Sequence, residues 1–243
     1  MSTEERKTIY LCLAHMSEEG YEQKYVKEAF DTNWVVPMGP NVNAFEQNLA
    51  DFANANSDGS KLARKVVCLS AGTAAVHLAL IACGVKTGDE VCVQSFTFCA
   101  SSHPITYLGA KPVFIDSERE TWNMDPELLE KAIIERKAAI GKYPKAIIPV
   151  ALYGMPYDCE RIMAIADKYG IPVIEDAAEG LGSRFNGQVL GTFGRFGVLS
   201  FNGNKMITTS GGGALICRNE EDANNIMLSL IHISEPTRHA QIS

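Results

Sequence analysis

Short apolar segments alternate with segments of helical periodicity along most of the chain. Strands are predicted at 9–13, 65–69, 90–93, 112–115, 146–150, 172–175, 198–201 and 213–217. Helices are predicted at 18–30, 43–55, 73–83, 126–137 and 157–169, with a loop and a helix at 95–108. This alternation predicts an α/β fold, in which helices cover both faces of a mostly parallel sheet. Ligands bind beyond the carboxyl ends of such strands, so the loops after strands are where chemistry is expected.

Composition narrows the class of protein. The 243 residues hold 22 Lys and Arg against 29 Asp and Glu, a net charge of −7, which disfavours a nucleic-acid-binding protein. No apolar run approaches the ~20 residues of a membrane span, and the start lacks a signal-peptide core. The seven cysteines are scattered without a CxxC spacing, which indicates reduced thiols in the cytoplasm and predicts no metal site.

Residues 228–243 depart from this pattern. Segment 228–238 resembles the translation of a transposase-type sequencing adapter, and the last five residues resemble an index and primer in the same frame. We therefore expect a large domain at 1–227, with an N-terminal segment at 1–43, followed by a non-native tail. The native gene product is then expected to continue beyond this boundary. The alternative is an ordinary helix from 220 to 233.

The first candidate for chemistry is the turn Ser70-Ala-Gly72-Thr73, between a predicted strand and a predicted helix. Glycine lets the backbone approach an anion, and the N–H groups at a helix start point toward it. The segment has neither the GK[ST] of a P-loop nor the GxGxxG of a dinucleotide site. Alone, it also fits a tight turn with Thr73 as the helix N-cap.

The second candidate is the acidic segment that follows the strand at 172–175. Glu175 and Asp176 are adjacent on extended backbone, so their side chains should point to opposite faces and not share a site. A buried Asp176 requires a cationic partner or a protonated ring nitrogen. The alternative is a helix N-terminus with favourable acids, which would include Glu179.

The third candidate is Lys205, in the segment Ser200-Phe-Asn202-Gly-Asn204-Lys205 that precedes the glycine-rich run at 207–213. A lysine in a glycine-rich, apolar neighbourhood is a candidate for Schiff-base chemistry. It could equally be a surface lysine in a loop. Asn202 and Asn204 could simply form turns.

Together, the three segments supply the parts that a pyridoxal phosphate site requires. The helix start would bind the phosphate, Asp176 would hold the proton of the pyridine nitrogen, and Lys205 would form the Schiff base. Phe98, in Ser95-Phe-Thr-Phe98, would place a flat apolar face against the ring. One ligand would meet all of these groups, which is why this combined interpretation is preferred over three separate ones.

Segments 70–73, 95–98, 175–179 and 200–213 resemble the motifs of the DegT/DnrJ/EryC1/StrS sugar aminotransferases. The most specific motif is SFNGNKMITTSGGG, and the resemblance extends over 9–227. It is closest to the branch that aminates UDP-4-keto-6-deoxy-N-acetylhexosamines. The resemblance implies a fold-type-I, aspartate-aminotransferase-like large domain. The small C-terminal domain of the family lies outside this chain, and the full-length protein is expected to be a homodimer.

The resemblance also implies roles for individual residues. Lys205 matches the Schiff-base lysine, Asp176 matches the partner of the pyridine nitrogen, and Gly72, Thr73 and Ser200 match phosphate contacts.

The other matching residues are expected to lie around the pyridine ring of the cofactor. Phe98 matches the aromatic residue that stacks on the ring, and Asn202 is expected to be a further cofactor-binding residue. Glu179 lies where many members have Gln or His near the ring hydroxyl. Ala151 is a departure, because close relatives are expected to carry a polar residue such as His there.

The activity implied is transamination in two halves, in bacterial glycan and cell-surface polysaccharide biosynthesis. Glutamate is the expected amino donor and a keto-sugar nucleotide the acceptor, with Lys205 moving the proton in both halves. A related branch that removes a hydroxyl has His at the position of Lys205, so lysine favours transamination. The alternatives are another fold-type-I enzyme such as a lyase, a non-catalytic cofactor-binding or inactive fragment, and an oxidoreductase, which the missing dinucleotide motif disfavours.

Overall fold

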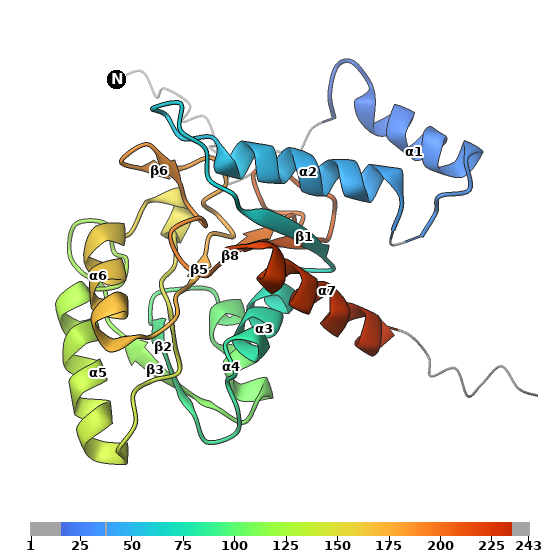
Figure 1. Cartoon of the computed structure of the whole chain (residues 1–243). Helices are drawn as coiled ribbons and strands as arrows, with labels where there is room; N and C mark the ends of the chain where they lie inside the picture. Colours follow the sequence, from blue (N-terminus) through green and yellow to red (C-terminus); the bar gives the residue numbers. More distant parts are fainter. Residues whose placement is uncertain (1–15, 37, 235–243) are drawn as a thin grey trace, which may run out of the picture.

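The computed structural model of the chain describes residues 16–36 and 38–234 (Figure 1). The helices are α1 (Tyr21–Asp31), α2 (Pro40–Asn54), α3 (Gly72–Ala82), α4 (His103–Tyr107), α5 (Pro126–Ile140), α6 (Cys159–Tyr169) and α7 (Glu220–Ser234), with 3₁₀ turns η1 (Cys99–Ser101) and η2 (Leu152–Gly154). The strands are β1 (Lys65–Leu69), β2 (Glu90–Gln94), β3 (Lys111–Ile115), β4 (Ala146–Ile148), β5 (Ile174–Asp176), β6 (Arg184–Phe185), β7 (Gln188–Val189), β8 (Phe196–Ser200) and β9 (Gly213–Cys217).

Seven of these strands form one continuous layer. Two hydrogen-bonded groups, β1-β9-β8-β5 and β4-β2-β3, meet where β4 and β5 run side by side. Parallel bridges join Ile147 to Val173 and Val150 to Asp176 at that junction. Strand β9 runs antiparallel to both of its neighbours, and the other pairings are parallel. The α/β fold with a mostly parallel sheet is therefore confirmed.

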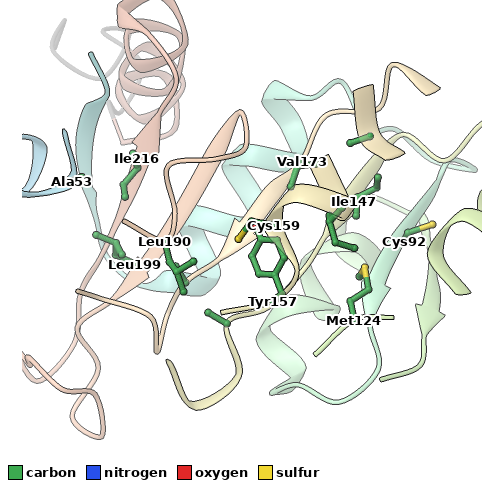
Figure 2. Close-up of a cluster of buried hydrophobic side chains, with 14 of the residues drawn as sticks. Ala53, Cys92, Met124, Ile147, Tyr157, Cys159, Val173, Leu190, Leu199 and Ile216 are labelled. Atoms are coloured by element: carbon green, nitrogen blue, oxygen red, sulfur yellow. The ribbon is translucent and has the colours of Figure 1, made fainter. Parts of the chain in front are cut away.

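Helices cover both faces of the sheet. Successive residues of a strand point to opposite faces, so neighbouring residues belong to different core clusters. Cys92 and Ile147 belong to a core cluster that includes residues of α2, α5 and α6, part of which Figure 2 shows around Tyr157. Their strand neighbours Val93 and Ile148 belong to a second cluster, built with residues of α3, α4 and α7. The two clusters make the sheet the central layer of the fold (Figure 1).

Helices α5 and α6 begin and end at residues suited to those positions. Asp125 accepts hydrogen bonds from two N–H groups in the first turn of α5, and Asp158 accepts one from Arg161 N–H in α6. Gly141 and Gly170 end these helices with φ of 77° and 65°, which glycine adopts without strain. The cap at Asp158 explains why α6 starts later than the predicted 157.

Most predicted elements are present, with small shifts at their ends. Strand β1 matches the predicted 65–69, and β4 ends two residues before the predicted 150. The hairpin β6–β7 was not predicted, although its turn, Asn186-Gly187, has positive φ at both residues, as a two-residue hairpin turn prefers. The predicted strand at 9–13 lies outside the described residues.

Helix α7 spans the boundary predicted after residue 227. It runs from Glu220 to Ser234 and passes position 227 without interruption. Its Ala223 and Ile226 side chains are buried, whereas Met227 and Leu228 are about half exposed. The non-native origin of 228–243 stays a prediction.

The thiols of the described residues are free. Cys83, Cys92, Cys159 and Cys217 are buried, and burial raises the pKa of Cys83, Cys92 and Cys217 to about 12, so these thiols remain protonated.

Among the helices of residues 16–36 and 38–234, none is long and apolar enough to span a membrane.

Candidate active site

A cavity of about 630 Å³ opens at the carboxyl-terminal edge of the parallel strands. The loops that follow β1, β2, β4, β5 and β8 contribute to it, as expected for a sheet of this kind. All residues singled out from the sequence as site residues line this cavity: Gly72, Thr73, Phe98, Asp176, Glu179, Ser200, Asn202 and Lys205. Segments more than a hundred residues apart in the sequence therefore meet at one place.

The start of helix α3 forms a small cradle against the end of β8. The helix begins at Gly72, and its N-cap is Ala71, which makes no side-chain capping bond. The alternative that Thr73 is the N-cap is therefore wrong, because Thr73 lies within the first turn. A Cβ at Gly72 would lie only 3.1 Å from the Cβ of Ser200. The space left by the absent side chain of Gly72, together with the N–H groups of the helix start, suits a phosphate group.

The glycines after Lys205 allow β9 to start beside this cradle. A Cβ at Gly213 would lie 2.4 Å from the carbonyl carbon of Ala71, so a larger residue would push the two segments apart. Gly212, with φ of 111°, donates its N–H to the carbonyl oxygen of Ser70 at 3.0 Å. The glycine run is evident in the sequence, but its contact with the helix start was not predicted.

Asp176 lies at the end of β5, with its carboxylate buried and facing the cavity. Its Oδ2 accepts a hydrogen bond from Ser101 Oγ at 2.6 Å, and its Oδ1 accepts one from Ala178 N–H at 3.2 Å. Glu175 instead accepts from the N–H groups of Gly191 and Gly194, at 3.0 and 2.6 Å. The prediction that the two acids do not share a site is confirmed.

Burial raises the pKa of the Asp176 carboxyl above its ordinary value. The hydrogen bonds from Ser101 and Ala178 and the charge of Lys205 act in the opposite direction, toward the ionised form. A ligand cation beside Asp176 would add to that opposing effect. The buried carboxyl thus fits the protonated ring nitrogen of pyridoxal phosphate.

Lys205 reaches the cavity from a loop closed by main-chain hydrogen bonds. Its N–H donates to the carbonyl oxygen of Asn202 at 2.9 Å, and Thr209 N–H donates to the carbonyl oxygen of Phe201 at 3.0 Å. The Lys205 side chain is 15% exposed, and its Nζ lies 3.3 Å from Glu179 Oε1. The turn role considered for Asn202 is present, and the residue also lines the cavity.

Phe98 presents its ring to solvent at the cavity, where 75% of the residue is exposed. An exposed aromatic face in the same cavity as a buried carboxylate suits a flat ligand that carries a ring nitrogen. Ala151, where a polar residue was expected, is buried in the first core cluster and does not line the cavity.

Two residues of the site, Ser101 and Tyr153, were not predicted from the sequence. Ser101 lies in η1 and bonds to Asp176, and its Oγ is also 2.8 Å from Thr97 Oγ1. Tyr153 donates its N–H to Glu179 Oε2 at 2.8 Å. Within the described ranges, no group of three His, Cys, Asp or Glu side chains is arranged to hold a metal ion.

Comparison with known proteins agrees with this geometry. A sequence model of the DegT/DnrJ/EryC1/StrS aminotransferase family matches residues 16–241. The chain is 51% identical over 237 residues to EpsN of Bacillus subtilis (strain 168), which bears the name of a pyridoxal phosphate-dependent aminotransferase. It is 39% identical over 207 residues to GDP-perosamine synthase of Escherichia coli O157:H7.

These alignments cover 98% and 85% of this chain, but 58% and 53% of the two relatives. The chain thus spans little more than half the length of the curated relatives it matches. A crystal structure of a DegT DnrJ EryC1 StrS aminotransferase from Brucella abortus superposes with a TM-score of 0.77 and 31% identity, covering 94% of this chain and 62% of that one. The fold is that of fold-type-I aminotransferases, and the chain belongs to the DegT/DnrJ/EryC1/StrS aminotransferase family.

Proposed function

We propose that the protein is a pyridoxal phosphate-dependent aminotransferase that acts on a keto-sugar nucleotide. The observation that carries the proposal is the meeting of Lys205, Asp176 and the Gly72 cradle in one cavity. Bound pyridoxal phosphate would supply an electrophilic carbonyl carbon and a ring that withdraws electrons. The names of the relatives, an aminotransferase and a GDP-perosamine synthase, support the reaction and the substrate class.

Five residues of the cavity have a binding role in this proposal. The helix start at Gly72 and Thr73, with Ser200 opposite, holds the phosphate. Asp176, whose carboxyl is buried, would accept the N–H of the ring nitrogen and, as an anion, favour the charged ring. Phe98 covers the ring face and excludes water from it.

Lys205 has the chemical role. Its amine lines the cavity and would hold pyridoxal phosphate at the carbonyl carbon. The same amine would take the proton from the α-carbon of the amino donor, and in the second half it would deliver a proton to the carbon that receives the amino group. Glutamate is the proposed donor, and the setting is bacterial glycan biosynthesis in the cytoplasm, in a full-length homodimer.

The test is the visible absorption spectrum of the purified chain with pyridoxal phosphate, before and after addition of glutamate. We expect a band that requires Lys205 and bleaches with glutamate, and Lys205→Ala is the control. A band that glutamate leaves unchanged would refute glutamate as the donor and favour another fold-type-I reaction, such as a lyase. A band of equal strength in Lys205→Ala would refute the assignment of Lys205.

A further inference from the structure

The turn after β4 has a strained backbone that the packing of its side chain does not explain. Tyr153 has φ of 51° and ψ of 27°, a left-handed conformation that residues with a Cβ rarely adopt. The residue is 71% exposed, so burial of the ring is not what holds it there. Such strain persists where the surrounding structure enforces it, and it is common at functional sites.

Buried Asn123 enforces the conformation of this turn. Its Oδ1 accepts the N–H of Leu152 at 3.1 Å, and its Nδ2 donates to the carbonyl oxygen of Met155 at 3.0 Å. The turn is closed further by Gly154 N–H, which donates to the carbonyl oxygen of Ala151 at 3.0 Å. With both sides fixed, the N–H of Tyr153 is directed at Glu179 Oε2, 2.8 Å away.

Gly154 allows the same turn to lie close to the backbone of Glu179. It has φ of 82°, and a Cβ there would lie 3.0 Å from the carbonyl oxygen of Glu179. The turn thus approaches Glu179 at both its backbone and its carboxylate. The second carboxylate oxygen, Oε1, lies 3.3 Å from Lys205 Nζ.

Two donors therefore face the two oxygens of one carboxylate. A glutamine of the same shape has one oxygen and one NH₂ group, so it could accept from one donor and would turn its own donor toward the other. In this chain the two contacts favour an acid over an amide at position 179.

We propose that Glu179 is a positioning residue: fixed by the Tyr153 N–H, its carboxylate holds the ammonium group of Lys205 toward the cavity before cofactor binds. That this position prepares Lys205 for pyridoxal phosphate rests on the function proposed above. The contact between Glu179 and Lys205 itself does not involve the cofactor. It can therefore be tested on the chain without pyridoxal phosphate, so its failure is separate from failure of the proposed function.

The experiment is limited acetylation of the cofactor-free chain with acetic anhydride, with each lysine quantified by mass spectrometry. The reagent must reach the amine, so a lysine whose side chain is 15% exposed and held by a carboxylate at 3.3 Å reacts slowly. In Glu179→Gln, we expect Lys205 to react about fivefold faster relative to the other lysines, a factor that corresponds to ~1 kcal/mol. The matched control is Glu130→Gln, whose partner Lys168 lies 2.7 Å away in an ion pair at the surface. That variant should speed the reaction of Lys168 and leave Lys205 unchanged.

A second measurement uses the wild-type chain alone, so it does not depend on how the variant folds. Amide hydrogen exchange at Tyr153 should be slow, although its side chain is largely exposed, because the N–H is bonded to Glu179. Unchanged labelling of Lys205 in a folded Glu179→Gln chain would overturn the proposal. Exchange of the Tyr153 amide at the rate of an unprotected peptide would overturn it as well.

Discussion

The substitution Asp176→Asn separates what the buried carboxyl does for the cofactor from what it does for the fold. Asparagine keeps the size of the side chain and an oxygen that can accept from Ser101 or Ala178. It removes the negative charge. Loss of a hydrogen bond between a charged carboxylate and the ring N–H should weaken binding by ~2–3 kcal/mol. We therefore expect the affinity for pyridoxal phosphate to fall about 100-fold, measured by titration of the visible band.

The same substitution should not weaken the cofactor-free fold at neutral pH. Burial raises the pKa of Asp176 in the folded chain above its ordinary value, so folding favours the protonated carboxyl. The contribution of Asp176 to stability is therefore full at pH below the ordinary pKa and is lost as pH rises through the raised pKa. Asparagine does not titrate, so the variant should gain stability relative to wild type across this window and keep the gain above it.

Urea denaturation of both chains without cofactor, over about pH 4 to 8, measures this difference. At the acidic end the protonated acid and the amide are alike, and the two chains should agree within about 0.5 kcal/mol. If Asp176→Asn were less stable than wild type by more than about 2 kcal/mol at neutral pH, the ionised carboxyl would be a structural group. The reasoning about the cofactor would then be refuted.

Three further changes test other parts of the account. Gly72→Ala places a methyl group 3.1 Å from the Cβ of Ser200, inside the cradle, and should weaken cofactor binding in the same titration. Phe98→Ala, at an exposed residue, should change unfolding by less than about 0.5 kcal/mol yet weaken cofactor binding about fivefold. Removal of 228–243 should leave the melting temperature nearly unchanged, because buried Ile226 is retained; a large loss would assign this segment to the fold.

Local pattern predicted most of the fold. The strands at 65–69 and 213–217 are short apolar segments between turns, and the structure places both at those positions. The reversed direction of β9 was not predictable, because direction depends on the path of the whole chain and not on the periodicity of five residues. The hairpin β6–β7 was within reach, since its Asn186-Gly187 turn is a recognised signal.

The site divides in a similar way. Gly72, Asp176 and Lys205 were predicted because each lies in a motif of suitable chemistry, and the structure brings them to one cavity. Ser101 was missed because 75 positions separate it from Asp176 and nothing local distinguishes it from other serines. Tyr153 was missed because it contributes a backbone N–H, which every residue except proline carries.

The central claim is that Lys205 binds the cofactor, and chemical trapping tests it most directly. The chain is mixed with pyridoxal phosphate, reduced with borohydride, and digested for mass spectrometry. The account predicts one cofactor adduct per chain, located on Lys205, and loss of that adduct when inorganic phosphate competes at the Gly72 cradle. An adduct that is spread over surface lysines, with Lys205 unmodified, would contradict it.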